Sequence, residues 1–314
     1  IGWDLILEFS IGAAVVAKGW SSYLGTVFGF SGGVADLGVV QLDWGALLII
    51  AIVATLLAFG TKLSSNFSAV ITAIKVAVVL LVVIVGSFYI KTANYTPFIP
   101  PPTPGDTAGT GVDQSLFSLL TGAAGSHYGL YGLLAGASIV FFAFIGFDVV
   151  ATTAEETKEP QRDVAKGILA SLAVVTVLYV AVSIVLSGMV PYTDLKTGPD
   201  GKHANLATAF AANGVHWAAT VISIGALAGL TTVVMVLVLG QTRVLFAMSR
   251  DGLLPRPLAK TGPHGTPVRI TVLVAVLVAV SASVFPIDKL EEMVNVGTLF
   301  AFILVSAGVI VLRR

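Results

Sequence analysis

Residues 141–163 read FFAFIGFDVVATTAEETKEPQRD, and the interpretation of the whole chain starts from this stretch. It begins as a membrane helix does, with three phenylalanines among aliphatic residues, and then places Gly146 and Asp148 inside the apolar run. Glycines and aromatic residues also suit ordinary tight helix packing. A carboxylate beside the glycine instead favours a helix that unwinds and restarts. Since unwound backbone is tolerated at membrane depth only where it is buried or lines a cavity, the pattern indicates an internal binding site.

The composition predicts an all-α polytopic membrane protein whose first partner is the lipid bilayer. Of 314 residues, 56% are hydrophobic and 11% are charged, whereas a soluble domain carries about 25% charged residues. Equal counts of basic and acidic residues, 17 each, argue against a nucleic-acid partner. The absence of cysteine excludes disulfides, thiolate metal sites and cysteine catalysis. The four histidines are scattered without metal-ligand spacing, and we predict neither a metal nor a cofactor.

Mostly apolar runs near the spanning length of about 20 residues follow one another along the chain. We predict a single transmembrane domain over 1–314 with eight spans, at 2–24, 44–60, 67–90, 128–154, 164–190, 217–247, 268–286 and 292–312. The fourth span, which extends to about residue 156, is the predicted discontinuous helix. Because the chain begins within an apolar run and without Met, we interpret it as a piece whose start lies upstream.

The charged residues between the spans predict the orientation. With Ile1 on the cytoplasmic side, eleven Lys and Arg residues fall on that side: Lys62, Lys158, Arg162, Lys166, Arg243, Arg250, Arg256, Lys260, Arg269, Arg313 and Arg314. Five fall on the other side: Lys18, Lys91, Lys196, Lys202 and Lys289. This bias follows the positive-inside rule. The outer segment 91–125 is rich in proline and glycine, which predicts irregular structure, and we assign it no role.

Lys75 belongs to neither group, because it lies about eight residues inside the span 67–90. At a rise of about 1.5 Å per residue it is about 12 Å deep. A lysine at mid-membrane costs on the order of 3 kcal/mol, so it should face protein or water and have a partner. It is either a structural charge partner or a proton-carrying group. Glu8, which shares a helix face with Asp4, is the acid that we predict to pair with Lys75 in one state of a transport cycle.

Five long motifs together resemble the amino acid–polyamine–organocation transporters, specifically the bacterial cationic amino acid transporter branch. The motifs are IGFDVVATTAEETKEPQRDVAKGI (145–168), GWDLILE (2–8), NFSAVITAIKVAVVLL (66–81), GALAGLTTVVMVLVLGQTRVLFAMSRDGLLP (225–255) and VGTLFAFILVSAGVIVLRR (296–314). The resemblance covers essentially the whole chain, with the motifs in the family's order. It implies a two-times-five inverted-repeat fold in which the eight spans are the family's third to tenth. The family's first two helices, including the first broken helix, would then be missing.

The resemblance also implies a substrate site at the break. Phe142 takes the position of the aromatic residue that closes over the substrate. Phe142, Ala143 and Ile145 would offer backbone carbonyls to the amino group of an L-amino acid. Ile145 and Leu237 would line the side-chain pocket, and Gly12 would leave room for the side chain. This pocket suits alanine-sized and medium neutral amino acids, although a long cationic side chain could reach past it.

A second set of matched residues concerns proton coupling. Lys75 matches a lysine that takes the place of sodium in related carriers, and Glu8 matches the acid linked to it. Asp148 matches an acid that braces the unwound segment. Thr231 and Thr232 match the position of the sodium site in those carriers, although hydroxyls that bond back to their own helix explain both threonines equally well.

The function implied is a proton-coupled amino acid symporter in the plasma membrane of a bacterium, with an L-amino acid and protons as partners. An exchanger or a sodium-coupled carrier is the alternative within transport, and a non-transporting amino acid sensor is the alternative from another class. No phosphate loop, hydrolase elbow or paired catalytic aspartates are visible, so we do not predict an enzyme. Glu156 is a candidate inner gate with Arg243 or Arg250. The sequence does not identify an accessory subunit.

Overall fold

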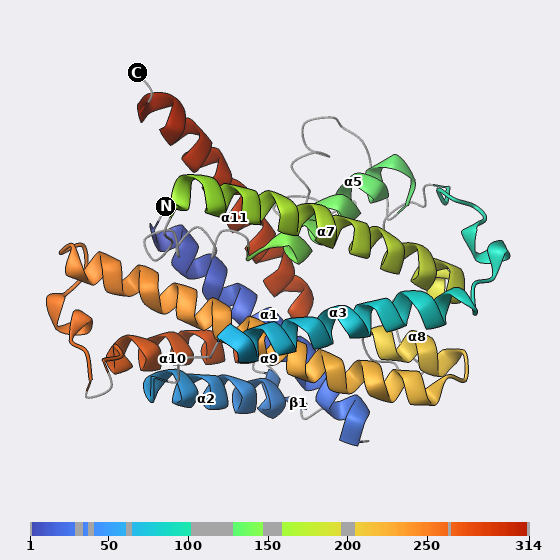
Figure 1. Ribbon diagram of the computed structural model, residues 1–314, viewed down its shortest axis with the longest axis horizontal. Coiled ribbons are helices and arrows are strands. Elements are labelled where there is room, and N and C mark those ends of the chain that lie inside the picture. Colours follow the sequence, from blue (N-terminus) through green and yellow to red (C-terminus); the bar gives the residue numbers. More distant parts are fainter. Residues whose placement is uncertain are drawn as a thin grey trace.

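The computed structural model describes residues 2–28, 34–36, 41–60, 65–101, 128–146, 159–195, 205–262 and 265–312. Most of them are helical (Figure 1). The α-helices are α1 (Gly2–Phe28), α2 (Trp44–Ala58), α3 (Ser65–Ser87), α5 (Gly129–Val140), α7 (Pro160–Met189), α8 (Leu206–Ala212), α9 (His216–Arg250), α10 (Val268–Val284) and α11 (Ile287–Leu312). Four 3₁₀ turns accompany them: η1 (Thr92–Tyr95), η2 (Phe141–Phe144), η4 (Tyr192–Asp194) and η5 (Arg256–Ala259). The strands are β1 (Val34–Asp36) and β2 (Gln41–Asp43).

This architecture confirms the predicted class, an all-α polytopic membrane protein. Within the described ranges, five helices are long and apolar enough to cross a membrane: Gly2–Phe28, Ala69–Ser87, Arg162–Met189, His216–Arg250 and Lys289–Val311. Three apolar helices are shorter: Trp44–Ala58, Gly132–Phe144 and Val268–Val284. The helices lie in the ranges where the sequence predicts spans, but the division into eight spans remains a prediction.

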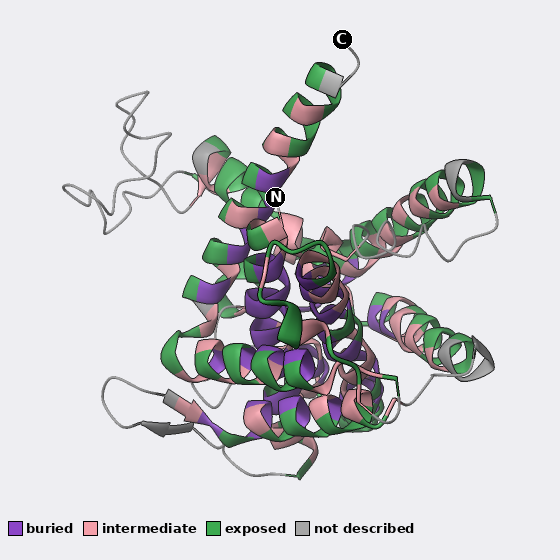
Figure 2. Cartoon of the chain, turned by 90° about the vertical axis from the view of Figure 1, so that its left-hand side faces the viewer, coloured by how far each residue is buried: buried purple, intermediate pink, exposed green. Residues whose placement is uncertain are grey.

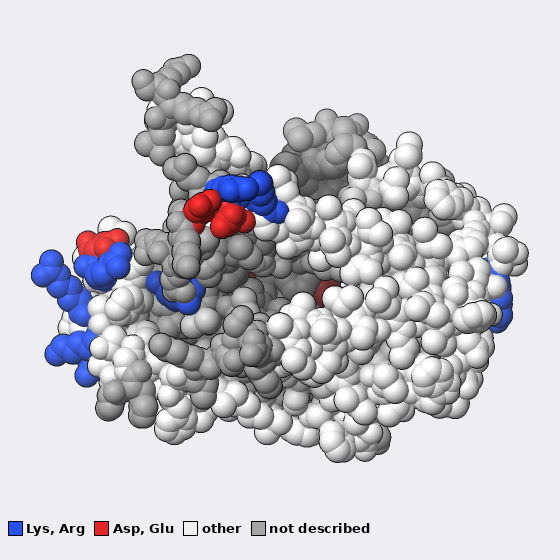
Figure 3. All heavy atoms as spheres, in the orientation of Figure 1, with Lys and Arg blue, Asp and Glu red and all other residues white. Residues whose placement is uncertain are grey.

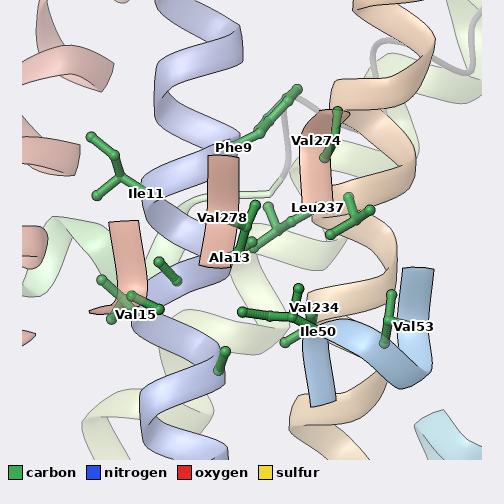
Figure 4. Packing of buried hydrophobic residues seen from close by; sticks show 14 of the residues in the cluster. Phe9, Ile11, Ala13, Val15, Ile50, Val53, Val234, Leu237, Val274 and Val278 are labelled. Atoms are coloured by element: carbon green, nitrogen blue, oxygen red, sulfur yellow. The ribbon is translucent and has the colours of Figure 1, made fainter. Parts of the chain in front are cut away.

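The main core lies where α1 packs antiparallel to α9. Figure 2 shows the buried positions gathered in the middle of the molecule, while the helices that project from it are largely exposed or intermediate. A Cβ added at Gly12 would lie 3.7 Å from the side chain of Leu237, and one at Gly19 would lie 4.0 Å from Leu230. Small residues on α1 therefore let the two helices approach closely, as is usual in membrane bundles. Side chains of α2 and α10 complete this core (Figure 4).

A second cluster joins α3, α7, α8 and α9. Its fully buried members include Val82, Met189, Phe210 and Ile222. Gly86 of α3 lies so close to α7 that an added Cβ would overlap the side chain there. The outward faces of α3 and α7 carry exposed leucine, valine and isoleucine side chains. Such faces suit contact with lipid, in which exposed aliphatic side chains cost nothing.

The two short strands were not predicted. They form an antiparallel ladder in which Val34 faces Asp43. Asp43 also caps α2, because its Oδ1 accepts the amide N–H of Ala46 at 3.1 Å and the hydroxyl of Ser21 at 2.6 Å. The cap fixes the start of α2 against α1. Three-residue strands leave too little alternation of polar and apolar residues to recognise in a sequence.

The start of the outer segment is ordered on α7. The amide N–H of Lys91 and the side-chain amide of Asn94 both donate to the carbonyl of Gly188, at 2.9 and 2.8 Å. The hydroxyl of Tyr95 donates to the carbonyl of Ile184 at 2.7 Å. The segment therefore leaves α3 along a defined path, in contrast to the irregular structure that its composition predicts. Residues 102–125 lie outside the described part.

Candidate functional site

The helix that follows the outer segment ends where the sequence predicts an interruption. Regular α-helix ends at Val140, and the next four residues, Phe141–Phe144, form a 3₁₀ turn. Ile145 then has an extended backbone with φ −61° and ψ 138°, and Gly146 has φ +117°. A positive φ of this kind is readily adopted only by glycine, so Gly146 allows the chain to leave the helix axis here.

Two neighbouring helices satisfy the carbonyls near the break. The side-chain amide of Asn295 on α11 donates to the carbonyl of Ile139 at 3.2 Å. The hydroxyl of Tyr179 on α7 donates to the carbonyl of Ala143 at 2.6 Å. The carbonyl of Phe142 accepts the amide N–H of Ile145 at 3.1 Å. Neighbouring side chains thus supply hydrogen-bond donors to backbone carbonyls at the break, as suits non-helical backbone within a bilayer.

Aromatic contacts hold the same segment on both sides. The rings of Phe141 and Phe302 are edge to face with centroids 5.9 Å apart, and those of Phe144 and Tyr179 are 5.2 Å apart. Both geometries are favourable for aromatic pairs. The break is therefore positioned between α7 and α11. Sequence analysis missed Asn295 and Tyr179, since nothing near either residue indicates a distant backbone partner.

Four of the five residues predicted to bind substrate meet in or beside the main core. Leu237 is buried in this core, and Phe142 and Ile145 pack against it partly buried. Gly12 contacts Leu237 from α1. Figure 4 shows Leu237 of α9 pointing toward α1 near Ala13 and Val278. The fifth, Ala143, adjoins Phe142 and presents the carbonyl that Tyr179 now occupies.

A buried polar group lies one turn from Leu237. The side chain of Gln241 is fully buried, and its Nε2 donates to the carbonyl of Ile6 at 3.1 Å and to the hydroxyl of Ser10. The hydroxyl of Ser10 donates in turn to the carbonyl of Ile6 at 2.8 Å. Glu8 lies between these two residues on α1 and is only 2% exposed. The predicted acid is thus held inside the protein, on the same turns of α1 that Gln241 contacts. Sequence analysis missed Gln241.

Lys75 occupies a different level of the bundle. Its half-buried stem lies against Gly229, where an added Cβ would be 3.4 Å from Cγ and 3.5 Å from Cε. Among the residues that the structure describes, its ammonium group makes no hydrogen bond or ion pair. Gly229 and Gln241 are twelve residues apart on α9, about 18 Å along the axis. This conformation therefore does not bring Lys75 to Glu8, and their pairing in another state remains a prediction.

The predicted ion-site threonines bond back to their own helix. The hydroxyl of Thr231 donates to the carbonyl of Leu227 at 2.7 Å, and that of Thr232 donates to the carbonyl of Gly229 at 2.8 Å. Thr231 also accepts the indole N–H of Trp20 at 3.0 Å. Hydroxyls that bond back to their own helix account for the contacts of both threonines, while a role in proton coupling remains a prediction. Sequence analysis missed Trp20.

Only part of the predicted gate lies within the described residues. Asp148 and Glu156 lie outside the described residues, while Arg243 is half-buried on α9. The other candidate partner, Arg250, pairs with Asp251 at 3.3 Å. Figure 3 shows the charged side chains of this face gathered mainly at the end of the molecule where α9 ends and α7 begins. That is the end predicted to be cytoplasmic, and the inner gate remains a prediction.

Comparison with known proteins identifies the family. A family model described as amino acid permease matches residues 2–314. The chain belongs to this amino acid permease family. It is 37% identical over 326 residues to the branched-chain amino acid permease BcaP of Bacillus subtilis (strain 168) and 39% identical over 324 residues to the methylthioribose transporter of that organism. It is 35% identical over 325 residues to the vacuolar cationic amino acid transporter 4 of Arabidopsis thaliana.

Each of these matches covers 100% of the chain, but the chain spans only 63% of the two bacterial relatives and 49% of the plant relative. The family and these relatives are transporters rather than enzymes, as the sequence predicts. Together with the spanning helices, family membership makes this a multi-pass membrane protein.

Proposed function

We propose that the protein containing this chain is a secondary transporter that carries an amino acid together with protons by alternating access. The observation that supports this most directly is the break after Val140, which lies against the core formed by α1 and α9. Carbonyls at an interrupted helix can bind an ammonium group through their second lone pair, and its amides can bind a carboxylate; an amino acid carries both charges. The two-times-five inverted repeat belongs to the same proposal.

The proposed substrate site uses both sides of this contact. The carbonyls of Phe142, Ala143 and Ile145 bind the amino group, and the ring of Phe142 closes over the substrate. Leu237 and Gly12 contact the side chain. Their apolar surfaces favour a small or medium neutral amino acid, since a cationic side chain has no acid to meet there. The names of the relatives include branched-chain and cationic amino acids, so both classes belong in the test.

Lys75 is the proposed proton carrier. Its stem packs against Gly229 of α9, and an ammonium without an acid beside it is costly within a membrane. Loss and gain of its proton would change its interactions with α9, where Thr231 and Thr232 lie one turn or less from Gly229. In another state the charged form pairs with Glu8, while Asp148 braces the unwound segment.

Reconstitution of the full-length protein into liposomes tests the proposal. With radiolabelled alanine outside, an inward proton gradient should drive accumulation and a sodium gradient alone should not. Excess leucine should compete more strongly than arginine. Accumulation driven by sodium, or only exchange against internal amino acid, would replace symport with the alternative mechanisms. Saturable binding without flux would indicate a sensor, and competition by methylthioribose but not by amino acids would overturn the substrate class.

The predicted location is a bacterial plasma membrane with Ile1 on the cytoplasmic side. The charge bias of the sequence supports this orientation, and two bacterial relatives support the source. Labelling of single cysteines from either side of intact cells tests it, because the chain has no cysteine of its own. A cysteine replacing Arg256 should react only after the membrane is opened.

A further inference from the structure

The chain that leaves α3 is rich in aromatic side chains. Residues 88–101, which we call the outer strap, read FYIKTANYTPFIPP. Four of these residues are aromatic, whereas aromatic residues make up only 9% of the whole chain, and Lys91 is the only charged residue in the strap. Side chains that face water are mostly charged or polar. The composition of the strap therefore differs from that of a loop in water.

Hydrogen bonds fix the level of the strap against a membrane-spanning helix. Two N–H groups of the strap donate to the carbonyl of Gly188, and the hydroxyl of Tyr95 donates to the carbonyl of Ile184 at 2.7 Å. Both carbonyls belong to the last turns of α7, inside the apolar span Arg162–Met189. Ile184 lies five residues before the end of α7, which is about 8 Å along the axis. The strap is thus held beside the end of a spanning helix rather than beyond it.

The strap follows a close path from α3 across α7 to α5 (Figure 1). A Cβ added at Gly188 would overlap the hydroxyl of Tyr95 and lie 2.9 Å from the side chain of Ile90. At the far end of the strap, the carbonyl of Pro100 accepts the amide N–H of Gly129 at 3.1 Å, where α5 begins. Contacts at both ends therefore set its position.

Other apolar side chains of the strap are exposed. Phe88 is 82% exposed and Phe98 is 88% exposed, and Tyr89 and Ile99 are exposed as well. Phe88 directly follows α3, whose outward face carries exposed aliphatic side chains. Ile184, to which the strap bonds, belongs to the corresponding exposed face of α7. The strap therefore extends the two faces that suit contact with lipid, and exposed apolar patches of this kind mark interaction surfaces.

We propose that the outer strap is an interfacial anchor whose partner is the lipid bilayer, with Phe88 and Phe98 among the headgroups and upper acyl chains. Aromatic side chains suit this boundary between water and hydrocarbon. Lys91 extends its stem along the apolar surface and keeps its ammonium group among the headgroups. Continuity with the lipid-facing surfaces of α3 and α7 favours lipid over a protein partner. The inference requires only the membrane location of the chain and not the proposed transport.

Single cysteines in the full-length protein test the depth of the strap, because this chain has no cysteine of its own. Phe98→Cys carries an environment-sensitive fluorophore in vesicles of phosphatidylcholine and phosphatidylglycerol. These lipids bear a nitroxide quencher either near the headgroup or near the end of the acyl chain. Val177→Cys marks the hydrocarbon interior, since Val177 is exposed on α7 about 16 Å before Gly188. Arg256→Cys, in the exposed turn after α9, marks water.

The nitroxide near the headgroup should quench the label at Phe98 at least about threefold more than the label at Arg256. The label at Val177 should be quenched most by the nitroxide at the end of the acyl chain. Equal quenching of the labels at Phe98 and Arg256 would overturn the inference. Blue-shifted emission at Phe98 without quenching by either lipid would also overturn it, because a second copy of the chain or another protein would then cover the strap.

Tyr95→Phe in the Phe98→Cys protein tests whether the bond to α7 sets the depth. The phenyl ring keeps its packing against Gly188 but cannot donate to the carbonyl of Ile184. Quenching by the nitroxide near the headgroup should fall at least about twofold. Tyr192→Phe is the matched control, because the ring of this exposed tyrosine keeps its edge-to-face contact without the hydroxyl. An equal effect of the two substitutions, or none, would contradict the role assigned to Tyr95.

Discussion

The indole of Trp20 donates one N–H to two acceptors on α9, the hydroxyl of Thr231 at 3.0 Å and the carbonyl of Leu227 at 3.1 Å. This contact joins α1 to α9 beside Gly229, against which Lys75 packs from α3. Three helices thus meet at one level around a hydroxyl, an indole and an amine. The substrate-site residues Gly12 and Leu237 lie about two turns away along the same pair of helices.

Trp20→Phe should weaken the contact between α1 and α9 without leaving a large cavity. The phenyl ring keeps most of the apolar contact but has no N–H, and a net hydrogen bond of this kind is worth about 1 kcal/mol. We expect a lower thermal unfolding temperature in detergent. Trp217→Phe is the control, since Trp217 is 59% exposed on α9 and should tolerate the change. Equal effects of the two substitutions would contradict a specific role for Trp20.

Asp43→Ala should affect stability and not transport. The carboxylate accepts from Ser21 and from the first turn of α2, so its loss removes an N-cap worth about 1–2 kcal/mol and leaves the buried Ser21 hydroxyl unsatisfied. Uptake per folded molecule should stay unchanged, because Asp43 does not contact the substrate-site residues. Asp194→Ala, at an exposed aspartate whose carboxylate accepts from the neighbouring Thr193, serves as control and should leave the unfolding temperature unchanged. A change of more than twofold in the KM or kcat of Asp43→Ala would contradict the expectation that Asp43 affects stability alone.

The class of structure and the position of the break follow from local properties of the sequence. Apolar runs long enough to span a bilayer predict helices without knowledge of their neighbours. Gly146 marks the break because tolerance of a positive φ is a property of glycine itself, and the structure shows such a φ there. Resemblance to a family then places Phe142, Ile145 and Leu237 together, and the structure indeed brings them to one core.

Hydrogen bonds between different helices could not be predicted from the sequence in this way. Asn295 and Tyr179 each satisfy a carbonyl on the broken helix, but a lone polar residue in an apolar run does not indicate which carbonyl it meets. For the same reason, the sequence does not show that the charged residues Glu8 and Lys75 lie at different levels of the bundle. Which charges pair depends on helix register, and the register depends on small residues such as Gly12 and Gly229.

Lys75→Met should separate binding from proton coupling. Methionine keeps an unbranched apolar stem against Gly229 but cannot carry a proton. We expect exchange of internal for external alanine to continue at equal pH, while accumulation driven by a proton gradient is lost. Lys18→Met is the matched control, because Lys18 is a half-buried lysine on α1 to which no coupling role is assigned. Proton-driven accumulation that persists in Lys75→Met would remove this residue from the coupling mechanism.

Gly12→Ala tests whether the contact between α1 and α9 limits the size of the substrate. The added Cβ would lie 3.7 Å from Cδ1 of Leu237, an ordinary van der Waals contact, so the fold should accept it. If the pocket lies here, the methyl group takes space from the substrate side chain. Since one methylene in an apolar pocket changes specificity by about 10–200-fold, KM for leucine should rise about tenfold relative to KM for alanine.

Gly19→Ala provides the comparison, because its added Cβ faces Leu230 at 4.0 Å on the same pair of helices, two turns from Gly12. This substitution should leave the ratio of the two KM values unchanged. Uptake of radiolabelled alanine and leucine by the full-length protein in liposomes measures both ratios. An identical ratio in the unaltered protein and in Gly12→Ala would place the side-chain pocket elsewhere, whereas a similar rise in both variants would show that helix spacing, rather than the space beside Leu237, controls the choice of substrate.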